Sequence, residues 1–231
     1  MTTWRRRAAA ATGPAFVVLL FLGNGLSTSG MSTETHPSGA RVLSDFARQA
    51  SHTTNRIGTA MELLAFVCLM VFIAHLYDVL RRRAAFAGAG ALMVIGAVTM
   101  LAVKISSGAP FFAGVMEHDR LSPDAAIALN ATNNAAFVIS WVPYAVFVGA
   151  TAVALRASGH LGRLLAGSGV LLAVVGILLA VVGVADLNSA NPVAFLLGAL
   201  WTLAVGVVLT VRPDRQVTPS GSPVALSAQP A

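Results

Sequence analysis

Charged residues are scarce in this chain of 231 residues, of which Asp, Glu, Lys and Arg together make up 10%. A soluble domain usually carries about 25% charged residues, so the composition excludes an ordinary soluble protein. The apolar residues account for 56% of the chain and are gathered in long blocks. Blocks of about 20 apolar residues are typical of helices that cross a membrane. The sequence therefore predicts an all-α fold, a polytopic transmembrane helix bundle.

Cysteine is nearly absent, and histidine is rare within the apolar blocks. The single cysteine, Cys68, excludes a disulfide framework and a Cys-rich zinc site. Only His75 falls within a predicted span, whereas bis-histidine haem ligation needs two histidines. The stretch around Ser168 lacks the leading glycine of the G-x-S-G motif of intramembrane serine proteases. The sequence contains no phosphate-binding loop either. We therefore predict no cofactor and favour a protein that is not an enzyme.

Six apolar blocks predict six spans in one membrane domain, residues 1–211. Their approximate bounds are 8–27, 57–80, 84–105, 135–155, 164–185 and 193–211. Residues 212–231 are rich in Pro, Ser, Gly and Gln, which predicts a disordered cytoplasmic tail. The arginines and apolar run of the first block also fit a cleaved signal peptide. No A-x-A-like site follows, so we favour a retained first span.

Basic residues gather at one end of the spans. That end carries ten arginines in short segments, at 5–7, 81–83, 156, 163, 212 and 215. By the positive-inside rule, both termini are predicted to lie in the cytoplasm. Because the basic residues orient spans, the net charge of +6 does not indicate nucleic acid binding. The preference for Arg over Lys, with abundant Ala and Val, suggests a bacterial source and hence a bacterial plasma membrane.

Two polar segments are predicted on the outer side. Residues 40–50 place Val42, Leu43, Phe46, Ala47 and Ala50 on one helical face, which predicts a short interfacial amphipathic helix. In the second segment, Ser122 can cap a helix that begins at Pro123. This helix is predicted to run into the fourth span, with a kink at Pro143.

The layout resembles a known group of proteins. Arginines close the second span in "HLYDVLRRR", and "ALRASGHLGRLLAGSGVLLAVVGILL" joins spans four and five. These features, with outer polar segments after the first span and before the fourth, resemble uncharacterised six-span membrane proteins common in actinobacteria. The resemblance covers most of the chain. It implies the fold, but it brings no established activity, cofactor or catalytic residue.

Glu62 is a carboxylate near the start of an apolar block. It lies 21 residues before Arg83, where the second and third spans are joined, and Lys104 lies 21 residues after it. Both therefore lie about 31 Å from the turn of an antiparallel hairpin, at one depth. Charges within a membrane tend to pair. We predict a Glu62–Lys104 ion pair in the outer leaflet; the alternative is that each side chain separately reaches headgroups or water.

Other polar residues are expected at the same level: Asn24, Asn133, Asn134 and Asp186. Together with the charged pair they could line an outward-facing cavity. The alternative, that they are helix ends meeting water, is favoured because most lie within two turns of a span end. His75, Asp78 and Arg82 form a separate group at the inner end, since His75 lies about 220° around the helix from Glu62.

A metal site has only weak candidates. Glu117, His118 and Asp119 are consecutive in an outer loop. Their side chains are of the kinds that bind metals. Consecutive ligands without a defined repeat are weak evidence, so we predict no metal site.

The fifth span carries a repeat of seven residues. Gly162, Gly169, Gly176 and Gly183 recur at that period, and so do Ala166, Ala173 and Ala180. Seven residues are nearly two turns, so these positions form one stripe of small residues. Such stripes allow close helix packing in membranes. We expect the stripe to face another helix, with the sixth span as the first partner and a second copy of the chain as the alternative.

The function favoured by the sequence is that of a non-enzymatic integral plasma-membrane protein, either structural, a partner subunit or an envelope component. The alternative is a small-molecule transporter or ligand-binding protein that uses the polar residues around Glu62 and Lys104. The lipid bilayer is the predicted partner, while a homo-oligomer or an unidentified membrane partner stays open.

Overall fold

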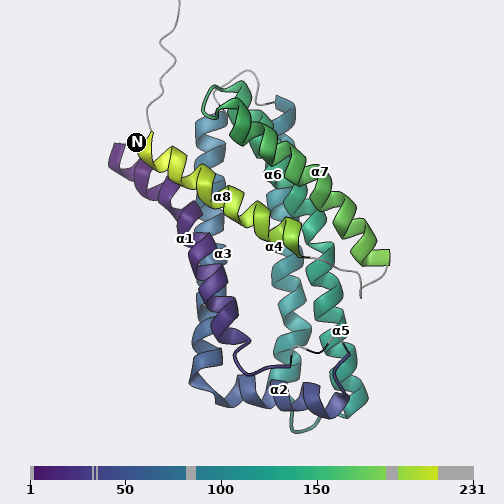
Figure 1. Cartoon of the computed structure of the whole chain (residues 1–231). Helices are drawn as coiled ribbons and strands as arrows, with labels where there is room; N and C mark the ends of the chain where they lie inside the picture. Colours follow the sequence, from purple (N-terminus) through teal and green to yellow (C-terminus); the bar gives the residue numbers. More distant parts are fainter. Residues whose placement is uncertain (1–2, 33, 35, 82–86, 186–191, 213–231) are drawn as a thin grey trace, which may run out of the picture.

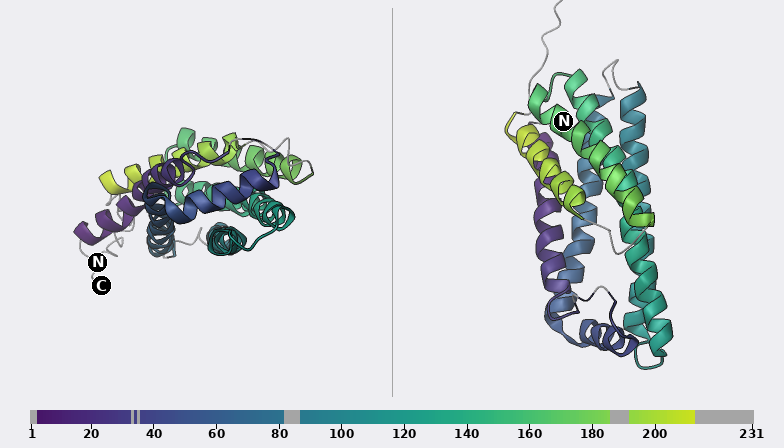
Figure 2. Two further views of the ribbon diagram at one scale, coloured as in Figure 1. Left: turned by 90° about the horizontal axis from the view of Figure 1, so that it is seen from below. Right: turned by 45° about the vertical axis from the view of Figure 1, so that its right-hand side comes forward.

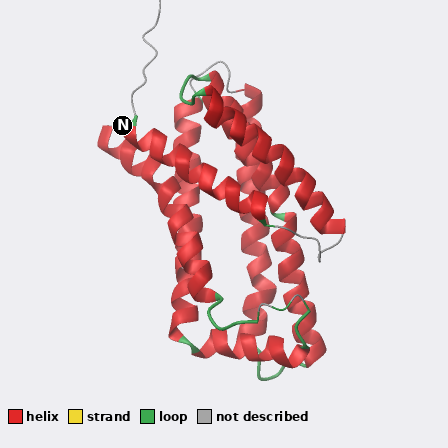
Figure 3. Ribbon diagram, in the orientation of Figure 1, coloured by secondary structure: helices red, strands yellow, loops and turns green. Residues whose placement is uncertain are grey.

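A computed structural model describes residues 3–32, 34, 36–81, 87–185 and 192–212. These residues form helices and connecting loops, and no strand occurs among them (Figure 3). Six helices, with α5 and α6 counted as one continuous span, are long and apolar enough to cross a membrane. The predicted all-helical fold with six spans is thereby confirmed. The predicted tail, apart from Arg212, lies outside the described residues.

Eight helices are described. They are α1 (Thr3–Ser27), α2 (Gly39–Ser51), α3 (Thr53–Leu80), α4 (Ala87–Met116), α5 (Pro123–Ile139), α6 (Trp141–Ala157), α7 (Arg163–Ala185) and α8 (Val193–Val211). The largest departure from the predicted bounds is in α4, which continues through residues 106–116. Hydropathy falls in that stretch, but the helix continues because Phe111 and Val115 pack against α2 and α5.

The fourth span consists of two consecutive helices, α5 and α6. Ser122 caps α5 by accepting a hydrogen bond from the Ala125 amide at 3.2 Å, and Pro123 occupies the first turn. The helix is interrupted at Ser140 and resumes at Trp141. Pro143 explains the interruption, because it has no N–H to donate to the Ile139 carbonyl and its ring crowds that group.

The helices form two groups that are joined at their ends. α1 packs most extensively against α3 and then α8, whereas α6 packs against α7 and α4, and α4 also packs against α5. The contact between α3 and α4 is sparse, although they follow each other in sequence. α2 runs across the lower end from α3 toward α5 (Figures 1 and 2). We call α1, α3 and α8 the first group, and α4 to α7 the second group.

α2 does not lay its apolar face on the bilayer. Val42 and Phe46 are 3% and 1% exposed, and they pack with Ala126 of α5. The Phe46 ring meets the Phe111 ring edge to face, at 5.8 Å between centroids, and lies over Gly114. The predicted interfacial position is thus replaced by a protein contact. The reason is the length of α4, which is about 45 Å, whereas α8 is about 28 Å long. Because α4 extends past a bilayer core of about 30 Å, its end offers α2 a protein surface to pack against.

The stripe of small residues on α7 is turned inward. The buried residues of α7 are Ala166, Gly169, Ala173, Gly176, Ala180 and Gly183, whereas Gly162, just before the helix, is exposed. Gly169 faces Ala152 of α6 and Trp201 of α8. α7 packs more extensively against α6 than against α8, which was the expected first partner. α6 also offers small side chains, including Ala145 opposite Gly176, and so permits the closer approach.

Candidate functional site: an outer polar cluster

Polar side chains from four helices gather near α2, at the end of the molecule opposite the N-terminus. We call this group the outer polar cluster, after the side of the membrane that the sequence predicts for it. Its members are Asn24 and Ser27 of α1, Gln49 of α2, Asn55, Thr59 and Glu62 of α3, and Lys104 of α4. The cluster therefore joins elements of both helix groups. It includes three of the residues expected from the sequence: Asn24, Glu62 and Lys104.

Glu62 is held against α1 by an unusually close helix contact. A side chain at Gly58 would overlap the Ser27 backbone nitrogen, and one at Gly23 would lie 2.9 Å from the Glu62 side chain. Because neither glycine carries a side chain, the two helix backbones approach each other directly. The Ser27 hydroxyl donates a hydrogen bond to Glu62 Oε1 at 2.5 Å. The Asn24 side chain also lies close enough to stabilise the Glu62 charge.

Lys104 approaches Glu62 from the second helix group. The two charges attract each other. However, none of the ion pairs found among the described residues joins them. Instead, Lys104 Nζ lies 4.2 Å from the centroid of the Phe137 ring on α5. This cation–π contact partly replaces the lost hydration of the ammonium. A direct Glu62–Lys104 ion pair stays a prediction.

The hydrogen bonds around Glu62 extend into a buried amide network. Asn55 is 1% exposed and donates to the carbonyls of Ser27 at 2.6 Å and Ser29 at 3.2 Å. The Gln49 amide donates to the Asn55 carbonyl at 3.2 Å and to the Thr59 hydroxyl at 2.5 Å. Gln49 Oε1 is buried and accepts no hydrogen bond from the described residues. The network fixes the start of α3 against α1 and α2.

Three members of the cluster were not expected from the sequence: Gln49, Asn55 and Thr59. A signal was present for two of them, since Asn55, Thr59 and Glu62 follow the i, i+4, i+7 spacing of one helical face. The predicted second span begins at residue 57, so Asn55 falls outside it and the pattern is cut short. Gln49 shares this spacing with Val42 and Phe46 in the predicted helix 40–50, which places it on the apolar face of that helix.

Other expected members of the cluster are elsewhere. Asn134 on α5 is exposed and Asn133 is half-buried, and among the described hydrogen bonds neither reaches the cluster. Asp186 lies outside the described residues. The structure thus brings together the charged pair and Asn24 but does not add Asn134 to them.

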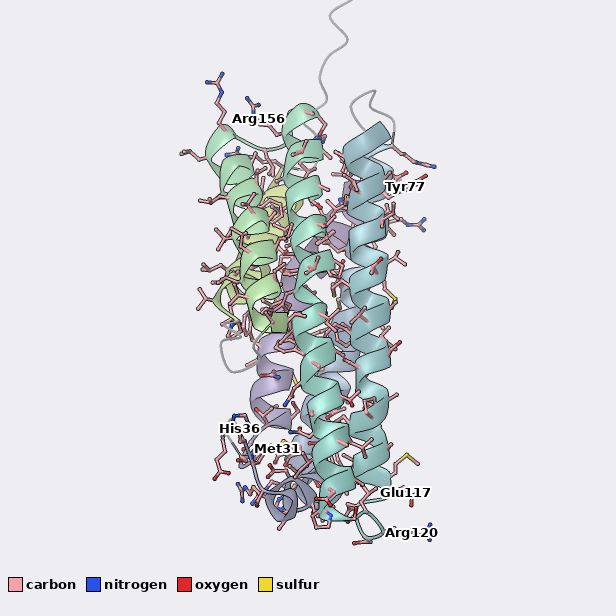
Figure 4. All side chains as sticks on the ribbon, turned by 90° about the vertical axis from the view of Figure 1, so that its right-hand side faces the viewer. Met31, His36, Tyr77, Glu117, Arg120 and Arg156 are labelled. Atoms are coloured by element: carbon pink, nitrogen blue, oxygen red, sulfur yellow. The ribbon has the colours of Figure 1, made fainter. Side chains whose placement is uncertain are left out.

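A separate polar group occupies the opposite end. His75 is 8% exposed and interacts electrostatically with Asp78, Arg6 and His160. Asp78 also pairs with Arg81 at 2.9 Å, whereas Arg82 lies outside the described residues. Figure 4 shows Tyr77 and Arg156 at this end, far from Glu117 and Arg120 at the other. Among the described residues of α3, no chain of polar side chains connects this group with the outer polar cluster.

Glu117, His118 and Asp119 interact locally. Glu117 pairs with Arg120 at 3.4 Å, and His118 Nε2 lies 3.2 Å from Asp119 Oδ1. His118 Nδ1 lies 2.9 Å from the Val115 carbonyl oxygen. Within the described ranges, no three His, Cys, Asp or Glu residues converge as metal ligands would.

Comparison with known proteins adds no relative. No protein family, no curated protein and no solved structure matches this chain. The function therefore has to be argued from the geometry of the chain itself.

Proposed function

We propose that this chain is a multi-pass protein of a bacterial plasma membrane, has no enzymatic activity and has both termini in the cytoplasm. Support comes from the six apolar helices and from the arginines gathered at the end that carries Arg156. Positive charges of short loops are retained on the cytoplasmic side during insertion. Membership of the uncharacterised actinobacterial group stays part of this proposal.

Ligand binding at the outer polar cluster is the function that the geometry supports best. The observation that carries it is the mutual attraction of Glu62 and Lys104, which belong to separate helix groups and are both largely removed from water. Charged side chains within a membrane are costly to maintain. A zwitterion would offset this cost, with its cationic group at Glu62 and its anionic group at Lys104.

A structural role is the second candidate, and a different observation favours it. Most polar side chains of the cluster make hydrogen bonds within the chain, namely those of Ser27, Gln49, Asn55 and Thr59. These bonds tie α1, α2 and α3 together at the outer end. In this case the cluster holds the helices in position for a protein partner, and Glu62 has no ligand outside the chain.

Thermal unfolding of the purified protein with small zwitterions separates the two candidates. Phosphoethanolamine and glycine betaine serve as probes, and the variants are Glu62→Gln, Lys104→Met and the double variant. Ligand binding predicts that at least one probe raises the Tm of the native chain and that each single variant abolishes the rise. This follows because a ligand that binds only the folded state stabilises it. Asn134→Ala, an exposed change outside the cluster, should leave the rise intact.

The same variants test the coupling between the two charges without any ligand. Residues that interact usually show a coupling free energy of about 0.5–3 kcal/mol in a double-variant cycle. We expect coupling within this range. Additive losses of stability would argue against the predicted interaction, and an unchanged Tm with every probe would leave the structural role as the better account.

A further inference from the structure

The two charges of the outer polar cluster lie near one boundary of the hydrocarbon core. Glu62 is nineteen residues before Arg81 (81 − 62), the arginine that follows α3, and so lies about 28 Å from that end of the helix. Lys104 is seventeen residues after Ala87 (104 − 87), where α4 begins, which gives about 26 Å. Because a hydrocarbon core is about 30 Å thick, both charges lie close to the depth at which phospholipid headgroups begin.

Lipid surrounds α3 and α4 at this depth. Leu63, which follows Glu62, and Ile105, which follows Lys104, are each 51% exposed. Gly108 lies one turn beyond Lys104 on the same face of α4, and a side chain there would meet no atom of another helix within 4 Å. The contact between α3 and α4 is also sparse. A lipid headgroup can therefore approach the two charges from the side.

The helix α2 restricts the approach from the aqueous side. It runs across the outer end from α3 toward α5 and packs against α3, α4 and α5 (Figures 1 and 2). Phe46 of α2 is buried against Phe111 of α4, so apolar side chains close this end of the second group. A ligand from the external solution has to pass α2, whereas a ligand from the membrane does not. This geometry favours a lipid over a soluble zwitterion.

Charge complementarity indicates the kind of headgroup. Glu62 and Lys104 belong to separate helix groups, lie at a similar depth and attract each other. A zwitterionic headgroup that lies along the membrane surface can place its ammonium at Glu62 and its phosphate at Lys104. An anionic headgroup without an ammonium offers Glu62 no cation. The site is therefore suited to a zwitterionic phospholipid.

The surroundings of Glu62 favour a primary ammonium over the quaternary ammonium of choline. A carboxylate can accept about four hydrogen bonds, of which the Ser27 hydroxyl supplies one, and the Asn24 side chain also lies close. A primary ammonium donates to the remaining positions, whereas a quaternary ammonium has no donor. Quaternary ammonium groups are instead bound by aromatic rings, and the ring near this site, that of Phe137, is in contact with Lys104.

We propose that the outer polar cluster binds the headgroup of phosphatidylethanolamine, which enters between α3 and α4 from the surrounding lipid. Its ammonium donates hydrogen bonds to Glu62, and its phosphate lies against Lys104 Nζ. This inference rests on the proposed ligand-binding function and deepens it by naming the source of the zwitterion.

Native mass spectrometry with lipids that share the same acyl chains tests the proposal. Phosphatidylethanolamine, its N-methyl and N,N-dimethyl derivatives, phosphatidylcholine and phosphatidylglycerol are added to the purified protein at equal concentrations. Successive methylation keeps the positive charge but removes one donor at a time. We expect phosphatidylethanolamine to bind about 10-fold better than phosphatidylcholine, roughly the smallest ratio that one hydrogen bond to a charged group provides. The two derivatives should fall between them, and phosphatidylglycerol should bind no better than phosphatidylcholine.

Glu62→Gln should reduce the preference for phosphatidylethanolamine to less than about 2-fold, because the hydrogen bonds of the ammonium then lose their charged acceptor. Glu117→Gln is the matched control and should retain the full preference, since this exposed carboxylate pairs with Arg120 outside the cluster. Equal binding of phosphatidylethanolamine and phosphatidylcholine by the native chain would overturn the proposal, however the variants fold. A preference that survives in Glu62→Gln would overturn it as well.

The lipid experiment can fail without the proposed function failing. If soluble phosphoethanolamine raises the Tm but the native chain does not distinguish phosphatidylethanolamine from phosphatidylcholine, the cluster binds a zwitterion and the lipid source is wrong. If the Tm is unchanged with every soluble probe and the lipids also bind equally, both the ligand-binding function and the lipid source are overturned.

Discussion

At the residue scale, Gly58 decides whether Glu62 can reach α1. A methyl group there would overlap the Ser27 backbone nitrogen and come within 2.8 Å of the Leu26 carbonyl carbon. Because the obstacle is backbone and not the end of a flexible side chain, the helices would have to separate. Such a separation would also lengthen the hydrogen bond from Ser27 to Glu62.

We therefore predict that Gly58→Ala lowers the free energy of unfolding by about 1–3 kcal/mol, the usual cost of overpacking. Gly25→Ala is the control, because no atom outside its own helix lies within 4 Å of the added methyl group. That change should be neutral or stabilising by up to about 1 kcal/mol, since alanine favours a helix over glycine. Thermal unfolding in detergent measures both; equal losses would show that the close contact of α1 and α3 is absent.

At the element scale, the stripe on α7 sets how this helix packs. Its small residues are buried against α6 and α8, while its large ones, such as Leu171 and Leu178, are exposed. Lipid supplies no hydrophobic drive between helices, so close contact of the backbones has to supply the packing energy. Shape, rather than polarity, therefore determines which face of α7 turns inward.

Replacing one stripe residue by leucine should weaken the packing of α7 against α6 and α8. A side chain at Gly169 would lie 2.6 Å from the Trp201 ring and 2.7 Å from Ala152. Gly169→Leu is expected to destabilise the protein by about 1–3 kcal/mol or more through overpacking. Leu171→Ala, two residues away and 63% exposed, should change stability by less than about 0.5 kcal/mol. Similar effects of both changes on the Tm would contradict the inward-facing stripe.

At the scale of the whole molecule, the ends of the bundle differ in charge and in structure. Arg156 lies at the end with short connections, and Glu117 and Arg120 lie at the end that α2 covers (Figure 4). We predict that the first end is cytoplasmic, because basic residues dominate there. The long α4 and the helix α2 would then form an external cap.

Cysteine labelling in intact cells tests this orientation. In a Cys68→Ala background, Asp119→Cys should react with a membrane-impermeant maleimide, and Ala157→Cys should react only after the membrane is permeabilised. Both positions are exposed, so access depends on the side of the membrane alone. The reverse pattern would invert the topology and place the outer polar cluster in the cytoplasmic leaflet.

The sequence by itself determined the spans, the break before Pro143 and the small-residue stripe of α7. These features are local: a membrane helix must satisfy its backbone hydrogen bonds within its own segment, so composition suffices to find it. The sequence also indicated Glu62 and Lys104, because a charge in an apolar block stands out whatever its neighbours are.

Only the tertiary structure decided which faces meet. The docking of α2, the burial of Gln49 and the contact of Lys104 with the Phe137 ring all depend on how helices rotate about their axes. When a helix is apolar on every side, its sequence does not show which face turns toward the other helices, because protein-facing and lipid-facing residues have similar hydropathy. The contacts that create a binding site therefore emerged only from packing.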